Sequence, residues 1–227
     1  GCNTVIASRS PERVERMAAS LANGVGFPDC NVRDSKCITS LFEFVDAKYG
    51  RLDILITSAG IGRGESAPGF KPDEVAFLNE TEWDEVIDTN LKGVYLAAKK
   101  AASYMLTRRR GQIINISSAR GAVRGHAYGA SYCASKMAAR ALFESMAAEL
   151  GPYGIRVLSF MPDAVDTDLI RGSRLANRGA ITPEQIGKIV ADALVIPMDT
   201  MLINLFILPI GAGIQHPLPI NQKAKAS

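Results

Sequence analysis

Hydrophobic positions along the chain change between short continuous runs and longer stretches with helical spacing. Short apolar runs are typical of strands buried on both faces, and apolar stripes every three to four residues are typical of amphipathic helices. The runs predict strands at 4–7, 26–32, 52–57, 112–117, 155–160 and 201–208. The stripes predict helices at 11–21, 34–49, 81–108, 130–150 and 183–194. Because strands alternate with helices, we expect a parallel sheet with helices on both faces, a three-layer α/β/α fold.

Local signals support the ends of these helices. Ser10 precedes Pro11, and a serine cap followed by proline at the first helical position is typical of a helix start. Gly50 follows the second predicted helix, and the pair Gly151-Pro152 follows the fourth. Glycine just past a helix and proline shortly after it mark a helix end. The region 61–80 is rich in glycine and proline and is predicted to be a loop.

Polar side chains follow the predicted strands and begin the fourth helix. Ligands of a parallel sheet bind at the carboxyl ends of its strands, and Ser118 directly follows the strand at 112–117. Tyr132 and Lys136 are four residues apart, so they share one face of the helix at 130–150. A free phenol has a pKa of about 10, and a nearby ammonium group favours its ionised form. By their spacing alone, Tyr132 and Lys136 are more simply interpreted as two residues on a solvated helix face, and an acid–base site is favoured only together with Ser118 and the order of the motifs described next.

Three motifs in this order resemble the classical branch of the short-chain dehydrogenase/reductase family. They are N-I-S-S-A-R-G with Ser118, Y-C-A-S-K with Tyr132 and Lys136, and D-T-N-L-K-G-V-Y with Asn90. The resemblance extends from Val5 to about Leu208 and implies a Rossmann-like, doubly wound sheet. It also implies hydride transfer between NADP(H) and a carbonyl or secondary alcohol substrate.

The resemblance gives each of these four side chains a role. Tyr132 exchanges a proton with the substrate oxygen, and Ser118 binds that oxygen through a hydrogen bond. Lys136 lowers the pKa of Tyr132 and holds the nicotinamide ribose. Asn90 bends its helix so that a backbone carbonyl holds a water linked to Lys136. The alternative is a non-catalytic regulatory or binding protein built on the same fold.

The cofactor prediction depends on the residues after the first predicted strand. An acidic residue there would favour NAD, and an arginine accepts the 2′-phosphate of NADP. Because Arg9 is present, we expect NADP, with NAD as the alternative. Thr57-Ser58-Ala59-Gly60 replaces the N-N-A-G of the family, and Asp163 replaces a glycine after Pro162, which could alter the turn beside the nicotinamide. The positions that the resemblance assigns to the cofactor are Arg9, Asn31, Val32, Thr57, Ala59, Gly60, Tyr132, Lys136, Val165 and Thr167.

The first strand of the family, with its glycine-rich turn T-G-x-x-x-G-x-G, has no counterpart before residue 4. In the strand order 3-2-1-4-5-6 that strand is central. We therefore expect a single dinucleotide-binding domain over 1–227 with its first strand absent and a tail at 211–227. Three explanations remain open: a fragment of a longer chain, a shortened gene product, or a gap filled by another strand or a partner chain.

Composition narrows the class of protein. The chain has 227 residues, 47% of them hydrophobic and 22% charged, which suits one soluble domain. A net charge of +3 gives no reason to expect nucleic-acid binding. Four cysteines without a C-x-x-C pair and two histidines predict no metal site. Free thiols and no apolar run of about 20 residues predict a cytoplasmic protein without a membrane segment.

Two further expectations concern partners. We expect a homodimer or homotetramer in which the helices at 81–108 and 130–150 pair through small residues on their outer faces. Substrate specificity is expected from 61–79, 120–131 and 168–180. The last segment is basic, which favours an anionic substrate, although a solvated basic loop is equally consistent with it. The small residues expected to pair the two helices between subunits are Ala97, Ala98, Ala138, Ala139, Ala147 and Ala148.

Overall fold

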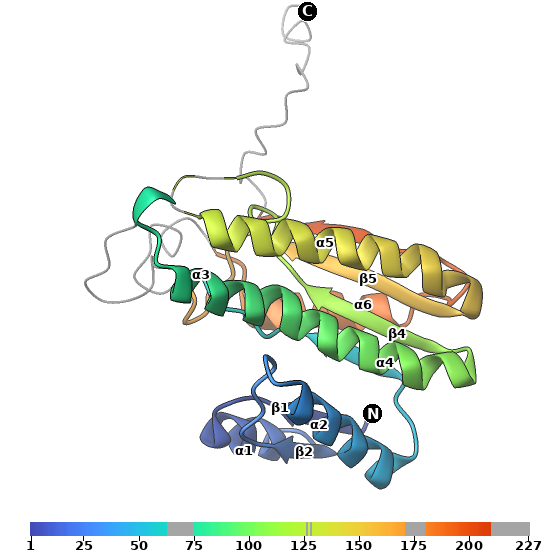
Figure 1. Cartoon of the computed structure of the whole chain (residues 1–227). Helices are drawn as coiled ribbons and strands as arrows, with labels where there is room; N and C mark the ends of the chain where they lie inside the picture. The colour runs from blue at the N-terminus through green and yellow to red at the C-terminus, as the bar shows by residue number, and fades with distance from the viewer. Residues whose placement is uncertain (63–74, 126, 128, 171–179, 210–227) are drawn as a thin grey trace, which may run out of the picture.

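Strands and helices alternate along the chain (Figure 1). The structure, a computed structural model, describes residues 1–62, 75–125, 127, 129–170 and 180–209. The strands in these ranges are β1 (Thr4–Ala7), β2 (Gly24–Phe27), β3 (Ile54–Thr57), β4 (Gly111–Ile116), β5 (Ile155–Pro162) and β6 (Asn204–Ile207). The α-helices are α1 (Pro11–Ala19), α2 (Ser35–Tyr49), α3 (Glu80–Ile87), α4 (Val94–Arg108), α5 (Ala130–Leu150) and α6 (Pro183–Leu194). The prediction of a parallel α/β architecture is confirmed.

The strands form two parallel sheets. One contains β1 and β2, and the other has the order β3-β4-β5-β6. Within the described residues no ladder joins β1 to β3, so each keeps one unpaired edge. The N-terminal unit, β1 to α2, is packed on the rest of the chain through α2 against α4 (Figure 1). The aromatic rings of Phe42 on α2 and Tyr104 on α4 have centroids 5.9 Å apart.

The four-stranded sheet has a hydrophobic core on each face. Helices α4 and α5 cover one face and α6 covers the other (Figure 1). Successive side chains of a strand point to opposite faces, so Ile113 of β4 packs with α4 and α5, and Ile114 packs with α6. All eight residues of β5 are buried. The carboxyl ends of β4 and β5 therefore form a rigid base for the loops that follow them.

The helix predicted over 81–108 is divided into three parts. A π-helical turn, η2 (Asp88–Gly93), lies between α3 and α4. Asn90 lies inside this turn with its side chain fully buried. Gly93 is required there because a Cβ atom would lie 2.7 Å from Cγ2 of Val32, which packs against the turn. Wide turns of this kind are frequent at functional sites.

Several strand limits also differ from those predicted. The second strand ends at Phe27 because Pro28 has no N–H to donate and Asp29 has a positive φ of 54°. The last strand is limited to Asn204–Ile207. Helix α5 has the predicted bounds and α6 begins with a complete capping box at Thr182.

The assignment of the alanines to the outer helix faces is wrong for most of them. These positions face the interior because α4 and α5 pack against β4 and β5 over much of their circumference. Ala148 is exposed and Ala138 is half-buried. The buried ones are Ala97, Ala98, Ala139 and Ala147, with exposed fractions of 7% or less.

Candidate active site

The four predicted catalytic side chains converge beyond the carboxyl ends of β3 and β4. Ser118 follows β4, Tyr132 and Lys136 occupy the first two turns of α5, and Asn90 comes from η2. Ser118, Tyr132 and Lys136 line a cavity of about 970 Å³, which we call the active-site cavity. Gly60 also lines this cavity, and Asn90 lies directly behind it. A Cβ atom on Gly60 would be 3.4 Å from Asn90 Oδ1 and 3.5 Å from Lys136 Nζ.

Ser118 is oriented toward the phenol of Tyr132. Its Oγ accepts a hydrogen bond from the backbone N–H of Gly121 at 3.1 Å. The serine hydroxyl then donates to the Tyr132 oxygen, which lowers the pKa of the phenol. Burial has the larger effect and raises the pKa of Tyr132 above its ordinary value. The expected lowering of this pKa is therefore opposed in the protein, and Tyr132 is held as the neutral acid.

Gly121 allows the tyrosine ring to lie in this position. A Cβ atom on Gly121 would be 2.6 Å from Cε1 of Tyr132, which is closer than side chains tolerate. The N-I-S-S-A-R-G motif thus supplies both the serine and the space for the ring that it contacts. Sequence reasoning identified the serine and missed the role of the glycine.

Lys136 is a buried cation whose ammonium group faces the active-site cavity. Its side chain is 6% exposed, and Nζ lies 5.8 Å from the centre of the Tyr132 ring. Within the described ranges no hydrogen bond or ion pair of Nζ is found. Burial lowers the pKa of Lys136 to about 8. Because a buried ammonium without an acceptor is costly, this group is available for an oxygen ligand in the cavity.

Asn90 connects η2 to the loop after β3 and to α5. Its Oδ1 accepts from the backbone N–H of Ile61 at 2.8 Å, and its Nδ2 donates to the Ile61 carbonyl at 2.8 Å. Nδ2 also donates to Oγ of Ser135 at 3.2 Å, and Ser135 donates to the carbonyl of Tyr132 at 2.8 Å. A bend is predicted at Asn90, and the structure has the π-helical turn η2 there. Sequence reasoning missed Ser135, although it stands next to Lys136 in the Y-C-A-S-K motif.

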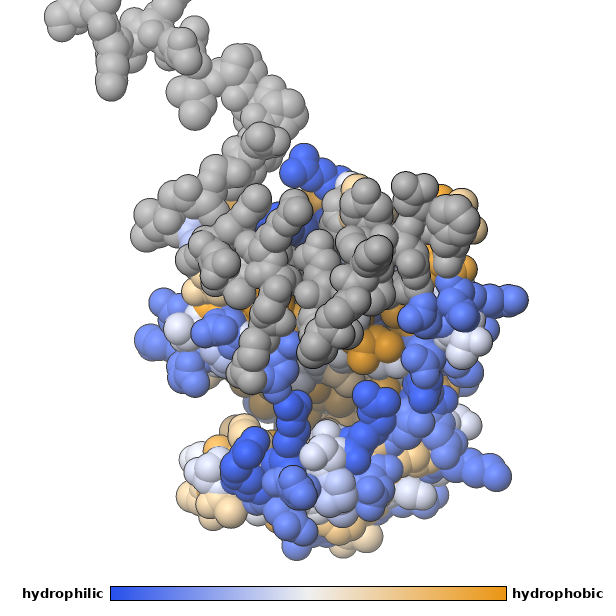
Figure 2. All heavy atoms as spheres, turned by 90° about the vertical axis from the view of Figure 1, so that its left-hand side faces the viewer, coloured by the Kyte–Doolittle hydropathy of each residue, from blue (hydrophilic) through white to orange (hydrophobic). Residues whose placement is uncertain are grey.

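The active-site cavity extends from Tyr132 toward the gap between the two sheets. Thr4 of β1, Ile56 of β3 and Ile186 of α6 line its far part. Ile56 is 44% exposed, although it lies in the middle of a strand. Figure 2 shows apolar surface at the bottom of a recess between the N-terminal unit and the rest of the molecule.

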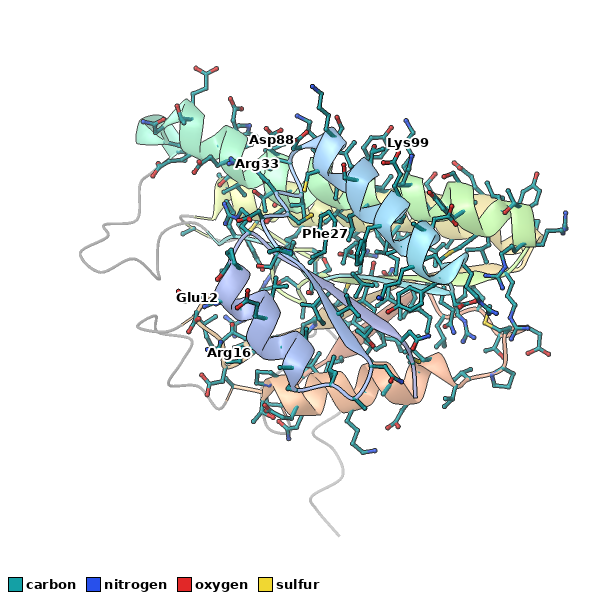
Figure 3. All side chains as sticks on the ribbon, turned by 90° about the horizontal axis from the view of Figure 1, so that it is seen from below. Glu12, Arg16, Phe27, Arg33, Asp88 and Lys99 are labelled. Atoms are coloured by element: carbon teal, nitrogen blue, oxygen red, sulfur yellow. The ribbon has the colours of Figure 1, made fainter. Side chains whose placement is uncertain are left out.

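The predicted cofactor positions lie at the carboxyl ends of the strands. In the N-terminal unit, Arg9 follows β1 and is exposed, and Asn31 follows β2 with its Oδ1 accepting from the N–H of Arg33. Figure 3 shows Arg33 on the side of the N-terminal unit nearest α3, where its guanidinium lies 3.5 Å from Glu85. Arg9, Asn31 and Arg33 are not among the residues that line the active-site cavity in the described part of the chain.

The remaining cofactor positions differ in their contacts. The hydroxyl of Thr57 donates within the sheet to the carbonyl of Ile114 at 3.3 Å, whereas Ala59 and Gly60 are exposed beyond β3. Thr167 lines the active-site cavity, and Val165 forms an isolated bridge with Ile181.

Asp163 occupies its turn without strain. Among the described non-glycine residues, a positive φ is found at Asp29 and Arg109, so Asp163 has an ordinary backbone conformation. Its carboxylate pairs with the guanidinium of Arg120 at 2.6 Å, and its N–H donates to the carbonyl of Ile207 at 2.9 Å. The pair joins the loop after β4 to the loop after β5 at the edge of the active-site cavity, and sequence reasoning did not predict it.

Some predicted specificity residues lie outside the described residues. They are residues 63–74, 126 and 128 and the segment 171–179 with its three arginines Arg171, Arg174 and Arg178, and the predicted tail at 211–227 also lies outside. In the part of the chain that the structure describes, no helix has both the length and the apolar content needed to cross a membrane.

Curated relatives match this chain over part of its length. The chain is 40% identical over 139 residues to a 3-oxoacyl-[acyl-carrier-protein] reductase, FabG, of Staphylococcus aureus, which is 61% of this chain and 53% of that protein. It is 32% identical over 180 residues to tropinone reductase-like 2 of Erythroxylum coca, covering 78% of this chain and 64% of the relative. The chain thus spans between about half and two thirds of the length of these relatives.

Solved structures share the fold. A metagenomic short-chain oxidoreductase in complex with NADP is 29% identical, with a TM-score of 0.75 over 92% of this chain and 86% of that one. An alcohol dehydrogenase of the archaeon Thermococcus sibiricus, complexed with 5-hydroxy-NADP, is 27% identical, with a TM-score of 0.76 over 89% and 84%. The family model of short chain dehydrogenases matches residues 1–178. The chain therefore belongs to the short-chain dehydrogenase/reductase family.

Proposed function

We propose that the protein is an NADP-dependent oxidoreductase that interconverts a carbonyl compound and the corresponding secondary alcohol. The buried ammonium of Lys136, which lacks an acceptor within the described residues and lies beside the Tyr132 ring, carries this proposal. The named relatives are reductases, and two of the similar solved structures contain NADP or a derivative of it. NAD remains the alternative cofactor.

The residues of the cavity fit a nicotinamide nucleotide. Lys136 Nζ needs an oxygen acceptor, and a ribose hydroxyl would supply one. Gly60 lies beside that nitrogen, since a Cβ atom at this position would be in ordinary contact with Nζ at 3.5 Å. When bound, the nicotinamide would supply or accept the hydride at the substrate carbon.

The protein's own residues would handle the proton and the substrate oxygen. In reduction, Tyr132 donates its phenolic proton to the carbonyl oxygen, and the Ser118 hydroxyl turns from the Tyr132 oxygen to donate its hydrogen bond to the same atom. The Lys136 ammonium stabilises the tyrosinate that remains. Asn90 and Ser135 fix the positions of the Ile61 backbone and of the first turn of α5, so that these groups need not reorganise during the reaction.

Arg9 should determine the choice between the two cofactors. We expect Arg9→Gln to weaken NADPH binding by roughly tenfold or more, because a hydrogen bond between two charged groups is worth about 1.5–3 kcal/mol. Binding of NADH, which lacks the 2′-phosphate, should change little. Calorimetry with both nucleotides would measure this, with Arg16→Gln on the exposed face of α1 as the control (Figure 3). An equal loss for both nucleotides would show that Arg9 does not read the phosphate.

We further propose that one more strand pairs with the facing edges of β1 and β3 in the active protein. A sheet in the order 3-2-1-4-5-6 has a strand at this place. Support comes from the unpaired edges, from the exposure of Ile56 and from the apolar recess. Such a strand could come from the same polypeptide or from a partner. Its presence should slow hydrogen exchange of the backbone amides of β1 and β3, which paired strands protect.

We also propose a homodimer or homotetramer through the outer faces of α4 and α5. Most of the alanines that were predicted to pair the helices are buried. The support for an oligomer comes instead from a stripe of small residues on α5 that is half-buried or exposed. We expect light scattering at micromolar concentration to give a mass at least twice 24.3 kDa. Ala141→Arg should lower it, and a monomer in the unaltered protein would contradict the proposal. The stripe consists of Ala134, Ala138, Ala141, Ser145 and Ala148.

A panel of ketones, aldehydes and hydroxy acids tests the activity itself. Oxidation of NADPH or reduction of NADP, read by absorbance, should occur with at least one carbonyl or secondary alcohol. Binding of neither NADPH nor NADH at millimolar concentration would instead favour a non-catalytic regulatory protein. We place the activity in the cytoplasm, because all four cysteines are free thiols.

A further inference from the structure

Two of the four cysteines, Cys30 and Cys37, flank the predicted cofactor positions Asn31 and Val32 in the sequence. Cys30 follows β2, and Cys37 is the third residue of α2. Cys37 Sγ lies 3.9 Å from the carbonyl oxygen of Asp29, the residue directly before Cys30, and both thiols contribute to the core beneath α2. The other cysteines are apart from this pair, since Cys2 precedes β1 and Cys133 is buried on α5. Neither member of the pair has a role in the proposed reaction.

The two thiols differ in their access to solvent. Cys30 is 1% exposed, whereas Cys37 is half-buried and reaches the carbonyl of Asp29 at 3.9 Å. Burial and the neighbouring Cys37 raise the pKa of the Cys30 thiol to about 12, so Cys30 remains protonated. An oxidant therefore reaches Cys37 first and finds Cys30 behind it.

We propose that Cys30 and Cys37 form a reversible disulfide that acts as a redox modification site beside the cofactor pocket. With a peroxide as oxidant, the Cys37 sulfur attacks the peroxide oxygen, which gives a sulfenic acid and one water. The Cys30 thiol then gives its proton to the departing hydroxyl group, which leaves as a second water, while the Cys30 sulfur forms the S–S bond with the Cys37 sulfur. The two thiols lose two electrons, and the peroxide is reduced to two waters. A dithiol reductant reverses the reaction by exchange.

The disulfide would close the turn that carries two predicted cofactor residues. Asn31 and Val32 lie between the two cysteines, and the turn is held by the bond from the N–H of Arg33 to Asn31 Oδ1 at 3.2 Å. The N–H of Cys30 donates to the carbonyl of Ser8, next to Arg9, at 2.9 Å. Shortening the distance between the two sulfurs therefore pulls on the residues at the carboxyl ends of both β1 and β2.

The same turn is in contact with the catalytic side of the molecule. The packing of Val32 on Gly93 of η2 leaves no space for even one methyl group. A shift of Val32 is thus transmitted to the π-helical turn that holds Asn90. We infer that oxidation weakens dinucleotide binding by at least about fivefold, the lower end of usual coupling between sites. By linkage, bound NADPH should make the dithiol harder to oxidise by the same factor, and a tenfold factor corresponds to about 30 mV.

The covalent step is tested on the full chain without any cofactor. After treatment with hydrogen peroxide, two of the four thiols should no longer react with a maleimide under denaturing conditions. The intact mass should fall by two hydrogen atoms, and a peptide linking Cys30 to Cys37 should appear and disappear with dithiothreitol. Cys2→Ser should behave in the same way, whereas Cys37→Ser should lose the change in mass. If Cys37 instead carries added oxygen while Cys30 stays free, or if the chains cross-link through Cys2, the proposal is overturned.

The effect on binding rests on the proposed function and is measured separately. NADPH titrations of reduced and oxidised protein should differ by at least about fivefold, and Cys37→Ser should abolish this difference. Equal affinities would overturn the regulatory effect while leaving the proposed function intact. If neither redox form binds a dinucleotide, the proposed function and the regulatory effect both fail, and the disulfide is judged on the mass measurement alone.

Discussion

Replacement of Tyr132 by phenylalanine should lower the turnover number for NADPH-dependent carbonyl reduction by about 10²- to 10⁴-fold, the usual contribution of a positioned general acid. The phenol is half-buried, receives a hydrogen bond from Ser118 and lies beside the Lys136 ammonium. Phenylalanine retains the ring that packs against Gly121 and removes only the ionisable oxygen. The affinity for NADPH should therefore change little, and the loss should appear in kcat.

Two further variants make this result specific. Tyr153 follows α5 and is exposed, and Tyr153→Phe should retain full turnover. Ser118→Ala removes the hydrogen bond that lowers the pKa of Tyr132, so its turnover should fall as well, with Tyr132 still present. Near-normal turnover of Tyr132→Phe with a good substrate would show that another group transfers the proton.

The sequence was sufficient to locate the reacting groups because their spacing is local. Tyr132 and Lys136 share a helix face by the geometry of any α-helix, and Ser118 follows a strand that the apolar pattern already identifies. The parallel α/β architecture could also be predicted, because it follows from the order of strands and helices along the chain. These features depend on residues that are close in the chain, and local periodicity reports on such residues.

The groups that support the site could not be predicted in this way. The bonds from Asn90 to Ile61 and to Ser135 join segments that are 29 and 45 residues apart. The pair of Arg120 with Asp163 spans 43 residues. Such contacts follow from the packing of whole elements, for which a single sequence contains no periodic signal. A pattern gives the presence of a polar residue in a helix, but it does not give its partner.

The alanines of α4 and α5 illustrate the same limit. A helix with alanine on several faces has little contrast between its inner and outer sides, so the pattern cannot identify the side that faces the sheet. Ala98 is fully buried, whereas Ala148 is exposed, although both stood in the same predicted set.

Lys136→Met should abolish turnover and also increase the stability of the unliganded protein. The ammonium is buried, and its pKa is lowered from 10.5 in the unfolded chain to about 8. A difference of this size corresponds to about 3 kcal/mol by which the buried charge opposes folding at neutral pH. Methionine has a similar length and no charge, so it removes this cost. Without the ammonium, the tyrosinate formed in the reaction has no countercharge, and we expect kcat to fall at least about a hundredfold.

The pH dependence of stability distinguishes this effect from a change in packing. Between pH 8 and 10.5 the unfolded chain retains the lysine proton, whereas the folded protein has lost it. The unfolded state therefore binds more protons than the folded state across this interval. As a result, the contribution of Lys136 to the free energy of unfolding rises with pH. The advantage of Lys136→Met should be largest below pH 8 and should become small near pH 10.5.

Urea denaturation at several pH values, followed by circular dichroism, would measure this difference. The exposed residue Lys188 on α6 provides a matched control, since its ion pair with Asp192 at 3.4 Å lies at the surface. Such a pair contributes about 0–1 kcal/mol, so Lys188→Met should leave both stability and turnover nearly unchanged. An advantage of Lys136→Met that is independent of pH would assign the gain to packing. A loss of stability below pH 8 would show that Lys136 has a partner that stabilises its charge and would remove the main support for a ribose-binding ammonium.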